Sequence, residues 1–110
     1  MDQRKAAEGF ALLADPNRLA ILWLLSQGER NAAGLLEELP VSQPTLSHHM
    51  RLLWNGGLVE RRRQGQRVIY TLCRPALREL LRAVPLEEPP ASPGAQPPEA
   101  PRVIIRSGHQ

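Results

Sequence analysis

Apolar residues recur at helical spacing from the start of the chain. In residues 3–13 the apolar positions include three alanines (Ala6, Ala7 and Ala11) together with Phe10 and Leu13. Small side chains allow two helices to approach closely. We therefore expect a first helix over 3–13 that packs closely against another helix.

A second helix is expected over residues 16–27. Asp15 is a capping residue, Pro16 suits the first helical position, and Gly28 is a stop signal. The segment 19–25 (LAILWLL) is apolar on every face. A helix without a polar face must be covered on nearly all sides, so this helix is predicted to be the centre of the core.

Two further helices follow in close succession. Asn31 caps a short third helix that runs to Leu39 with its leucines inward, and Pro40 ends it. A fourth helix is expected over 42–55 after a tight turn. Two helices joined in this way, the second exposing polar residues, form a helix-turn-helix.

The fourth helix has sharply different faces. Ser42 is a good N-cap, Pro44 suits the first turn, and Gly56-Gly57 can supply a left-handed stop. At about 100° per residue, one face carries Leu46, Met50 and Leu53, with His49 at its margin. The opposite face carries Pro44, Ser47, His48 and Arg51. This face offers short hydrogen-bonding groups and a cation, which suits a helix entering the DNA major groove; the alternative is an ordinary solvated face.

The hydrophobic period changes to two after Gly57. Residues 58–59 and 68–72 favour strands, separated by the polar stretch RRRQGQR. This pattern predicts a β-hairpin with an arginine-rich tip, which we interpret as a wing lying over the DNA backbone or minor groove. The alternative is an exposed hairpin that charge keeps soluble, but a mixture of positive and negative side chains would do this with less repulsion than four arginines.

A last helix is expected to begin at Pro75. Its apolar stripe consists of Leu77, Leu80, Leu81 and Val84. This stripe could close the core, or it could form a two-fold interface with Phe10 and Leu13 of the first helix. The expected fold is mainly α with a small β-hairpin, a winged helix-turn-helix.

Composition divides the chain near residue 85. Seven of the eleven prolines lie between residues 85 and 101, in a stretch without aromatic residues. Such a segment buries too little apolar surface to offset the entropy of ordering. We expect a DNA-binding and dimerisation domain over 1–85 and a proline-rich, disordered tail over 86–110. A β-prone segment at 102–106 could add a strand to a partner's sheet.

Positive charge is concentrated in the second half of the predicted domain. The formal net charge is +3, but residues 51–82 contain eight arginines against two glutamates. The chain has one lysine, and arginine is the side chain that binds phosphate and guanine in a bidentate manner. This distribution favours double-stranded DNA over a membrane surface as the partner. The predicted DNA-binding residues are Ser42, Gln43, Thr45, Ser47, His48, Arg51, Arg61, Arg62, Arg63, Gln64, Gln66 and Arg67.

Other classes of protein find little support. The N-terminal residues have no signal-peptide core and the apolar run 19–25 is too short to span a bilayer, so a cytoplasmic location is expected. The lone Cys73 excludes an intrachain disulfide, and we interpret it as a small buried hydrophobe in preference to a redox switch. We expect no enzyme, because there is no carboxylate pair, no nucleophile with a base in sequence context and no phosphate-binding glycine loop.

The segments LADPNRLAILWLL, SQPTLSHHMRLL and GGLVERRRQGQRVIYTL resemble the ArsR/SmtB family of bacterial winged-helix repressors, over about residues 8–84. The resemblance implies a homodimer, joined through its first and last helices, that represses its own operon and releases DNA when an inducer binds. It places base contacts on Gln43, Ser47 and His48, and backbone contacts on Arg51 and the wing arginines.

The sequence departs from the metal-sensing members of that family. Asn31 and Ala33 stand where many members have a cysteine pair for soft metals, and the last helix has a single carboxylate and no histidine. Adjacent His48 and His49 diverge by about 100° and cannot chelate one ion together. Ala33-Gly34 is instead similar to the branch that binds no metal. No metal or other cofactor is expected.

Three hypotheses remain at this point. The leading one is a repressor that binds a palindromic operator as a homodimer and responds to a small molecule, a partner protein or only its own concentration. The second is a metal- or redox-responsive regulator with an atypical site. The third is a winged-helix module that binds protein, which should expose apolar anchors on the fourth helix.

Overall fold

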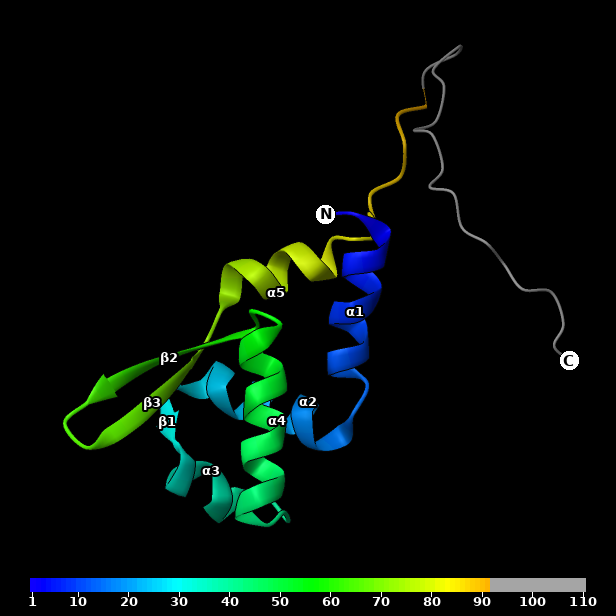
Figure 1. Cartoon of the computed structure of the whole chain (residues 1–110). Helices are drawn as coiled ribbons and strands as arrows, with labels where there is room; N and C mark the ends of the chain where they lie inside the picture. Colours follow the sequence, from blue (N-terminus) through cyan, green and yellow to red (C-terminus); the bar gives the residue numbers. More distant parts are fainter. Residues whose placement is uncertain (92–110) are drawn as a thin grey trace, which may run out of the picture.

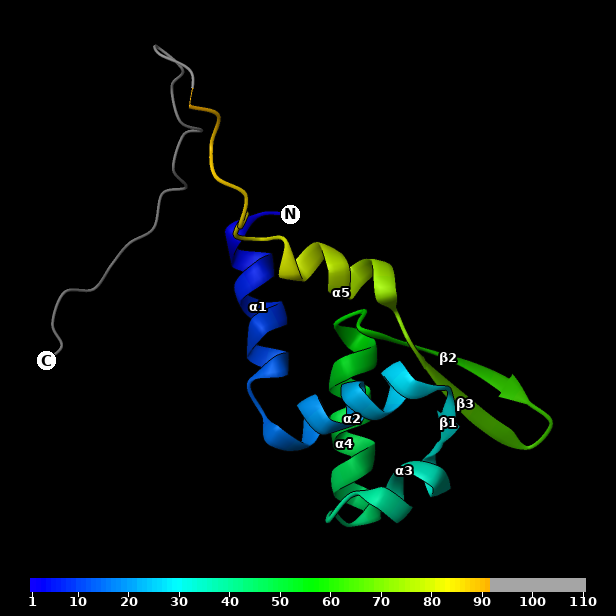
Figure 2. The same ribbon diagram turned by 180° about the vertical axis from the view of Figure 1, so that it is seen from behind.

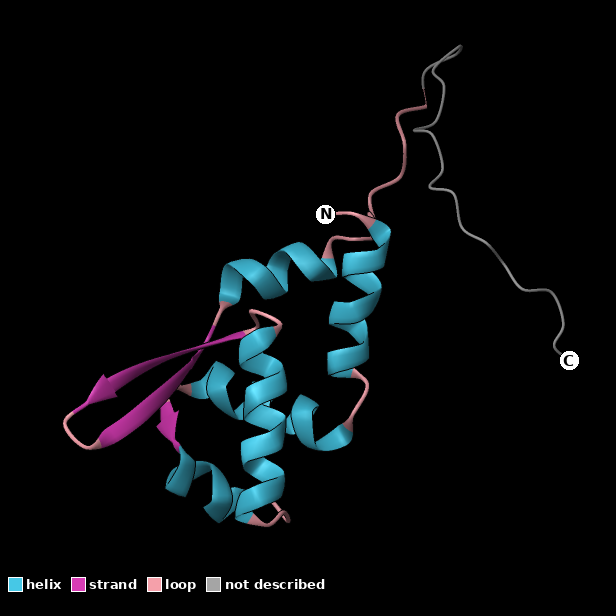
Figure 3. Ribbon diagram, viewed as in Figure 1, coloured by secondary structure: helices cyan, strands magenta, loops and turns pink. Residues whose placement is uncertain are grey.

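The computed structural model describes residues 1–91 and arranges them as five helices and a three-stranded sheet (Figures 1 and 3). The elements in chain order are α1 (Gln3–Leu13), α2 (Pro16–Gln27), β1 (Arg30–Asn31), α3 (Ala32–Glu38), α4 (Gln43–Asn55), β2 (Val59–Gln64), β3 (Arg67–Leu72) and α5 (Arg74–Leu81). This order confirms the predicted winged helix-turn-helix and adds one strand to it.

Side-chain caps set the start of the first two helices. The Asp2 carboxylate accepts the backbone N–H of Lys5 at 2.8 Å. The Asp15 carboxylate accepts those of Asn17 at 2.8 Å and Arg18 at 3.1 Å. These bonds satisfy N–H groups that have no partner within the helix. The boundaries predicted for both helices are confirmed.

The strand β1 was not predicted. Its two residues pair antiparallel with β3, Arg30 opposite Tyr70 and Asn31 opposite Ile69, which gives the sheet order β1-β3-β2. A two-residue strand is too short to show a period of two, so its sequence carries no signal. The pairing fastens the hairpin to the junction between α2 and α3.

The core collects side chains from helices and hairpin alike. Its fully buried large members are Ile21, Leu35, Leu46, Leu53, Leu80 and Val59. The prediction that α2 is covered on nearly all sides is wrong, because Leu19 is 54% exposed and Trp23 is 63% exposed. The helix contacts α1, α4 and β3, and these neighbours leave its remaining face open to solvent.

The last helix is shorter than predicted. It ends at Leu81, and Val84 lies beyond it with 67% of its surface exposed. Leu80 is 1% exposed and packs against Gly9 of α1, where a Cβ would lie 2.8 Å from a leucine methyl. Leu80 is therefore a core residue of the single chain, and its assignment to an exposed dimer face was wrong.

The predicted tail is described only at its start. Residues 86–91 are exposed and form no helix or strand. The remainder of the tail, with the apolar segment 102–106, lies outside the described residues. None of the helices within residues 1–91 has the length and hydropathy needed to cross a membrane.

Candidate nucleic-acid interface

Local bonds define the ends of α4. The Ser42 hydroxyl accepts the backbone N–H of Thr45 at 3.4 Å and donates to the Thr45 hydroxyl at 3.0 Å. Pro44 lies in the first turn, where no intrahelical donor is lost. At the other end Gly57 has φ of 77°, a conformation that favours glycine, while Gly56 stays in the right-handed region. The predicted left-handed stop is confirmed at Gly57.

One face of α4 is buried and the other is open. Leu46, Met50 and Leu53 enter the core together with His49, which is 6% exposed. The predicted contacts of this segment are all exposed: Ser42, Gln43, Thr45, Ser47, His48 and Arg51. The exposed side chains are short near the N-terminus of the helix and cationic one turn later. A ligand could therefore approach the helix end-on without meeting a bulky side chain.

His49 links α4 to the N-terminal helices. Its Nδ1 lies 3.3 Å from Nη1 of Arg18, and its Nε2 lies 4.0 Å from the Asp15 carboxylate. Arg18 also donates to the carbonyl oxygens of Leu12 at 2.8 Å and Ala11 at 3.4 Å. The Arg18 backbone N–H is the largest cause that lowers the pKa of Asp15 below 3.8. These bonds tie α4 to α2 and to the end of α1.

The two adjacent histidines have different surroundings. His48 is exposed and His49 is buried, although their ring centroids are only 5.9 Å apart. Asn31, which stands where a metal-sensing relative would have a cysteine, caps α3 by accepting the N–H of Gly34 at 2.8 Å. Within residues 1–91, no three His, Cys, Asp or Glu side chains gather closely enough to hold a metal ion.

Three of the hairpin arginines lie along β2, while Arg67 starts β3 directly after the turn. Arg61, Arg62 and Arg63 pair with Tyr70, Ile69 and Val68, and the ladder continues to Gln64 opposite Arg67. Gly65, with φ of 64°, starts the two-residue turn. The prediction of an arginine-rich tip was wrong in this respect, because the β-forming residues of β3 extend the ladder through the polar stretch. Successive arginines consequently point to opposite faces of the hairpin.

Arg61 lies against the C-terminal end of α4. Its guanidinium lies 3.8 Å from the ring centroid of Trp54. Stacking on an aromatic face leaves the N–H groups in the guanidinium plane free for other acceptors. The stack therefore couples the base of the wing to α4 and leaves Arg61 able to bind an anion.

Arg62 is bound by the carboxylate of Glu29, which follows α2. It donates two hydrogen bonds of 2.8 Å to the two oxygens of Glu29, and it also lies 3.4 Å from the Gln64 side chain. The bonds from Arg62 lower the pKa of Glu29 and raise that of Arg62. Both side chains are about half exposed, so this pair lies at the surface. The positive charge of Arg62 is therefore already compensated by Glu29 in the protein alone.

The other cations of this surface have no such partner. Arg51, Arg63 and Arg67 are exposed, and none forms an ion pair with a carboxylate of residues 1–91. Gln64 precedes the turn, Gln66 is its second residue, and both are also exposed. The structure thus presents the predicted polar face of α4 and a cationic hairpin on one domain. Of the arginines on these two elements, Arg62 is the one paired with a carboxylate of residues 1–91.

Sequence reasoning missed Glu29 and Trp54. Glu29 follows the stop glycine of α2, and Trp54 lies near the end of α4, positions that give no local sign of a role. Their partners lie in β2, so only the tertiary structure brings them together. Cys73, half-buried directly after β3, donates its backbone N–H to the Leu58 carbonyl at 2.9 Å and accepts the N–H of Leu77 at 3.1 Å, while its side chain makes no capping bond to α5.

Comparisons with known proteins agree with this architecture. Residues 15–61 match the family model described as bacterial regulatory protein, arsR family. The chain is 46% identical over 72 residues to an arsenical resistance operon repressor of Staphylococcus xylosus, covering 66% of this chain and 69% of that protein. It is 37% identical over 81 residues to an uncharacterised HTH-type transcriptional regulator of Methanocaldococcus jannaschii, and the match covers 73% of this chain and 91% of that protein.

A solved structure shows the same fold. It is an ArsR-like transcriptional regulator from Rhodococcus sp. RHA1, 32% identical, with a TM-score of 0.67 over 72% of this chain and 74% of that one.

Proposed function

Because the chain belongs to the arsR family of bacterial regulatory proteins, and is thus a DNA-binding transcriptional regulator, we propose that it is a homodimeric repressor of a palindromic operator. In this function α4 enters the major groove, and the hairpin lies over the adjacent backbone. A protein with this role acts where the DNA is, in the cytoplasm.

The observation that carries this proposal is that α4, with its exposed polar face, and the cationic hairpin are in direct contact through β2. Figure 1 shows the hairpin projecting from the body to the side of α4. Gln43, Ser47 and His48 supply hydrogen-bonding groups for base edges, and Arg63 and Arg67 supply cations for phosphates. The large apolar side chain that α4 exposes is Trp54, which is 41% exposed, and its ring carries the Arg61 guanidinium, so it does not offer the bare anchor that a protein-binding face would require.

Support for a dimer comes from the side chains that α1 and α5 leave open. These helices lie side by side at one end of the molecule (Figure 2). Phe10 is 39% exposed, Leu81 is 58% exposed, and Leu13 and Leu77 are half-buried. Val84 adds a further exposed apolar side chain. A two-fold related copy would cover this face and space two α4 helices for two half-sites.

Fluorescence anisotropy with the protein's own upstream DNA and a scrambled duplex tests the assignment of contacts. Gln43→Ala and His48→Ala should each lose about 1–3 kcal/mol of discrimination between the two DNAs if the base contact is bidentate. Arg63→Ala should weaken both complexes alike and reduce their salt dependence. If all three variants lose affinity equally on both duplexes, α4 does not read sequence.

Light scattering tests the dimer separately. Leu81→Glu places a charge on the proposed apolar face and should give monomers that keep their helix content. Arg82→Glu, a charge change at the neighbouring exposed position, serves as the control. A wild-type protein that is monomeric at all concentrations tested, or a Leu81→Glu variant that remains a dimer, would refute this interface.

A further inference from the structure

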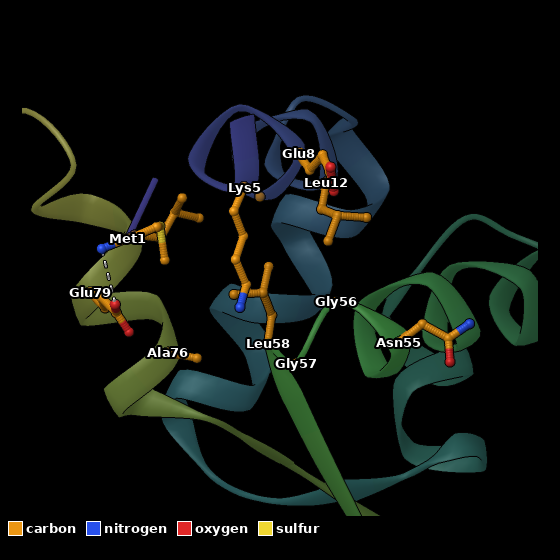
Figure 4. A pocket seen from close by; sticks show the side chains of 12 residues that line it. Met1, Lys5, Glu8, Leu12, Asn55, Gly56, Gly57, Leu58, Ala76 and Glu79 are labelled. Atoms are coloured by element: carbon orange, nitrogen blue, oxygen red, sulfur yellow. Dashed lines mark ion pairs between the residues drawn. The ribbon is translucent and has the colours of Figure 1, made fainter. Parts of the chain in front are cut away.

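A cavity of about 370 Å³ lies between α1, α5 and the turn that joins α4 to β2 (Figure 4). Its walls are mainly apolar, with Leu12, Leu58, Ala76 and Leu80 among them. Gly9 contributes no side chain to the wall. A volume of this size suits a small organic molecule.

One cation points into this space. Figure 4 shows the Lys5 side chain extending from α1 toward Leu58 across the cavity. No carboxylate of residues 1–91 lies within ion-pair distance of its ammonium. Glu79 on the α5 wall instead lies 3.8 Å from the Met1 amino group. Glu8 of α1 also lines the cavity, but its carboxylate is not within ion-pair distance of the Lys5 ammonium. Among the cations of the lining, Lys5 is thus the one without a carboxylate partner within residues 1–91, and a carboxylate on an apolar ligand would be its complement.

The cavity lies away from the proposed dimer face. On α1, the mean wheel direction of Lys5, Gly9 and Leu12 differs from that of Phe10 by about 130° and from that of Leu13 by about 75° at 100° per residue. On α5, Ala76 and Leu80 point about 100° away from Leu77 and Leu81 by the same measure. A partner copy seated on the exposed leucines would leave the cavity open.

The cavity also touches the connection between the two DNA-binding elements. Its lining includes Asn55, Gly56 and Gly57, where α4 ends, and Leu58, which precedes β2. Gly56 lies so close to Leu12 that a Cβ there would overlap the leucine methyl. The turn therefore has no room to move toward α1. A ligand too large for the cavity as it stands would therefore have to push the turn outward, away from α1.

We propose that this cavity binds a small, mainly apolar carboxylate and that its occupancy lowers the affinity for DNA. The second part rests on the proposed operator-binding function. By linkage, DNA then weakens carboxylate binding by the same factor.

Titrations of the ¹⁵N-labelled full-length protein, followed by NMR, test binding directly. The probes are phenylacetate, indole-3-acetate and octanoate, each compared with its neutral amide. The amide signals of Gly9, Gly57 and Ala76 should shift, and the acids should bind more tightly than the amides. Equal binding of acid and amide, or shifts confined to other surfaces, would overturn the proposal.

Amino-acid substitutions distinguish the effect of the Lys5 charge on binding from the effect of the cavity volume. Lys5→Gln should weaken the acids about three- to tenfold and leave the amides unchanged, the range expected for a partly exposed ion pair. Ala76→Phe fills the cavity and should weaken both. Arg4→Gln removes the same charge from α1 outside the lining and should change neither. An Lys5→Gln protein that binds the acids as the wild type does would refute the role of this lysine.

Anisotropy on the upstream duplex, with and without saturating probe, tests the coupling. The dissociation constant for DNA should rise at least about fivefold with the acid that binds most tightly, a typical lower value for coupled sites. Binding of the probe without any change in DNA affinity overturns the regulatory role of the cavity. Probe binding by a protein that shows no DNA affinity would instead be a failure of the proposed operator function.

Discussion

The pair between Arg62 and Glu29 should make neighbouring wing arginines unequal in DNA binding. Arg62 is already bound by two hydrogen bonds of 2.8 Å, whereas Arg63 forms no ion pair within residues 1–91. An arginine that neutralises a phosphate releases a counterion, and each such contact adds about 0.9 to the slope of log affinity against log salt. Between 50 and 200 mM salt, one contact therefore changes the affinity by about 3.5-fold.

Four variants follow from this arithmetic. Arg63→Ala should reduce the salt slope by about 0.9, and Arg62→Ala should reduce it much less. Glu29→Gln frees Arg62 for phosphate and should raise the slope by up to about 0.9, a gain that the double variant with Arg62→Ala should lose. Glu60→Gln removes the same charge from an exposed site on β2 that holds no arginine, and serves as the matched control.

The assay is anisotropy of a labelled operator duplex at 50, 100 and 200 mM salt, with circular dichroism to show that each variant is folded. Equal loss of slope in Arg62→Ala and Arg63→Ala would refute the idea that Glu29 withholds Arg62 from DNA. An equal gain in Glu29→Gln and Glu60→Gln would show that only the net charge matters.

Three further predictions concern stability, each measured by urea unfolding. Leu53→Ala removes a side chain of α4 that is 0% exposed and should lower the free energy of unfolding by about 2.7–5 kcal/mol; a loss below 1 kcal/mol would mean that the recognition helix is not anchored in the core. Gly57→Ala meets no atom within 4 Å but must adopt φ of 77°, so a loss on the order of 1–2 kcal/mol is expected from the backbone alone, and no loss would refute the strain argument. The pKa of Asp15 is lowered from 3.8 mainly by the Arg18 N–H. The ionised carboxylate therefore adds to the free energy of unfolding above pH 3.8, and this contribution is lost as the pH falls through the lower pKa of the folded state. Asp15→Asn, which keeps a capping oxygen, should flatten the fall in unfolding midpoint between pH 5 and about 2.5; an unchanged pH profile would show that another group is responsible.

Short-range chemistry explains why the helix boundaries and the faces of α4 were predictable. The residues that start and end these helices act only on their near neighbours in the chain. Asp15 and Ser42 do so through capping bonds, Pro16 and Pro44 through a fixed φ, and Gly57 through a positive φ. Leu46, Met50 and Leu53 are one turn apart, so a single helix geometry brings them to the same face. The candidate DNA contacts on α4 followed from this geometry, and their exposure agrees with it.

Contacts between distant segments were decided only by the tertiary structure. Arg62 meets Glu29 across 33 residues, Arg61 meets Trp54 across the turn after α4, and β1 exists only because β3 lies beside it. Periodicity could not show that Leu80 packs on Gly9 within one chain, or that Trp23 stays in solvent on an apolar helix. A sequence specifies which face of an element is apolar, but the neighbours that cover that face depend on how all the elements pack.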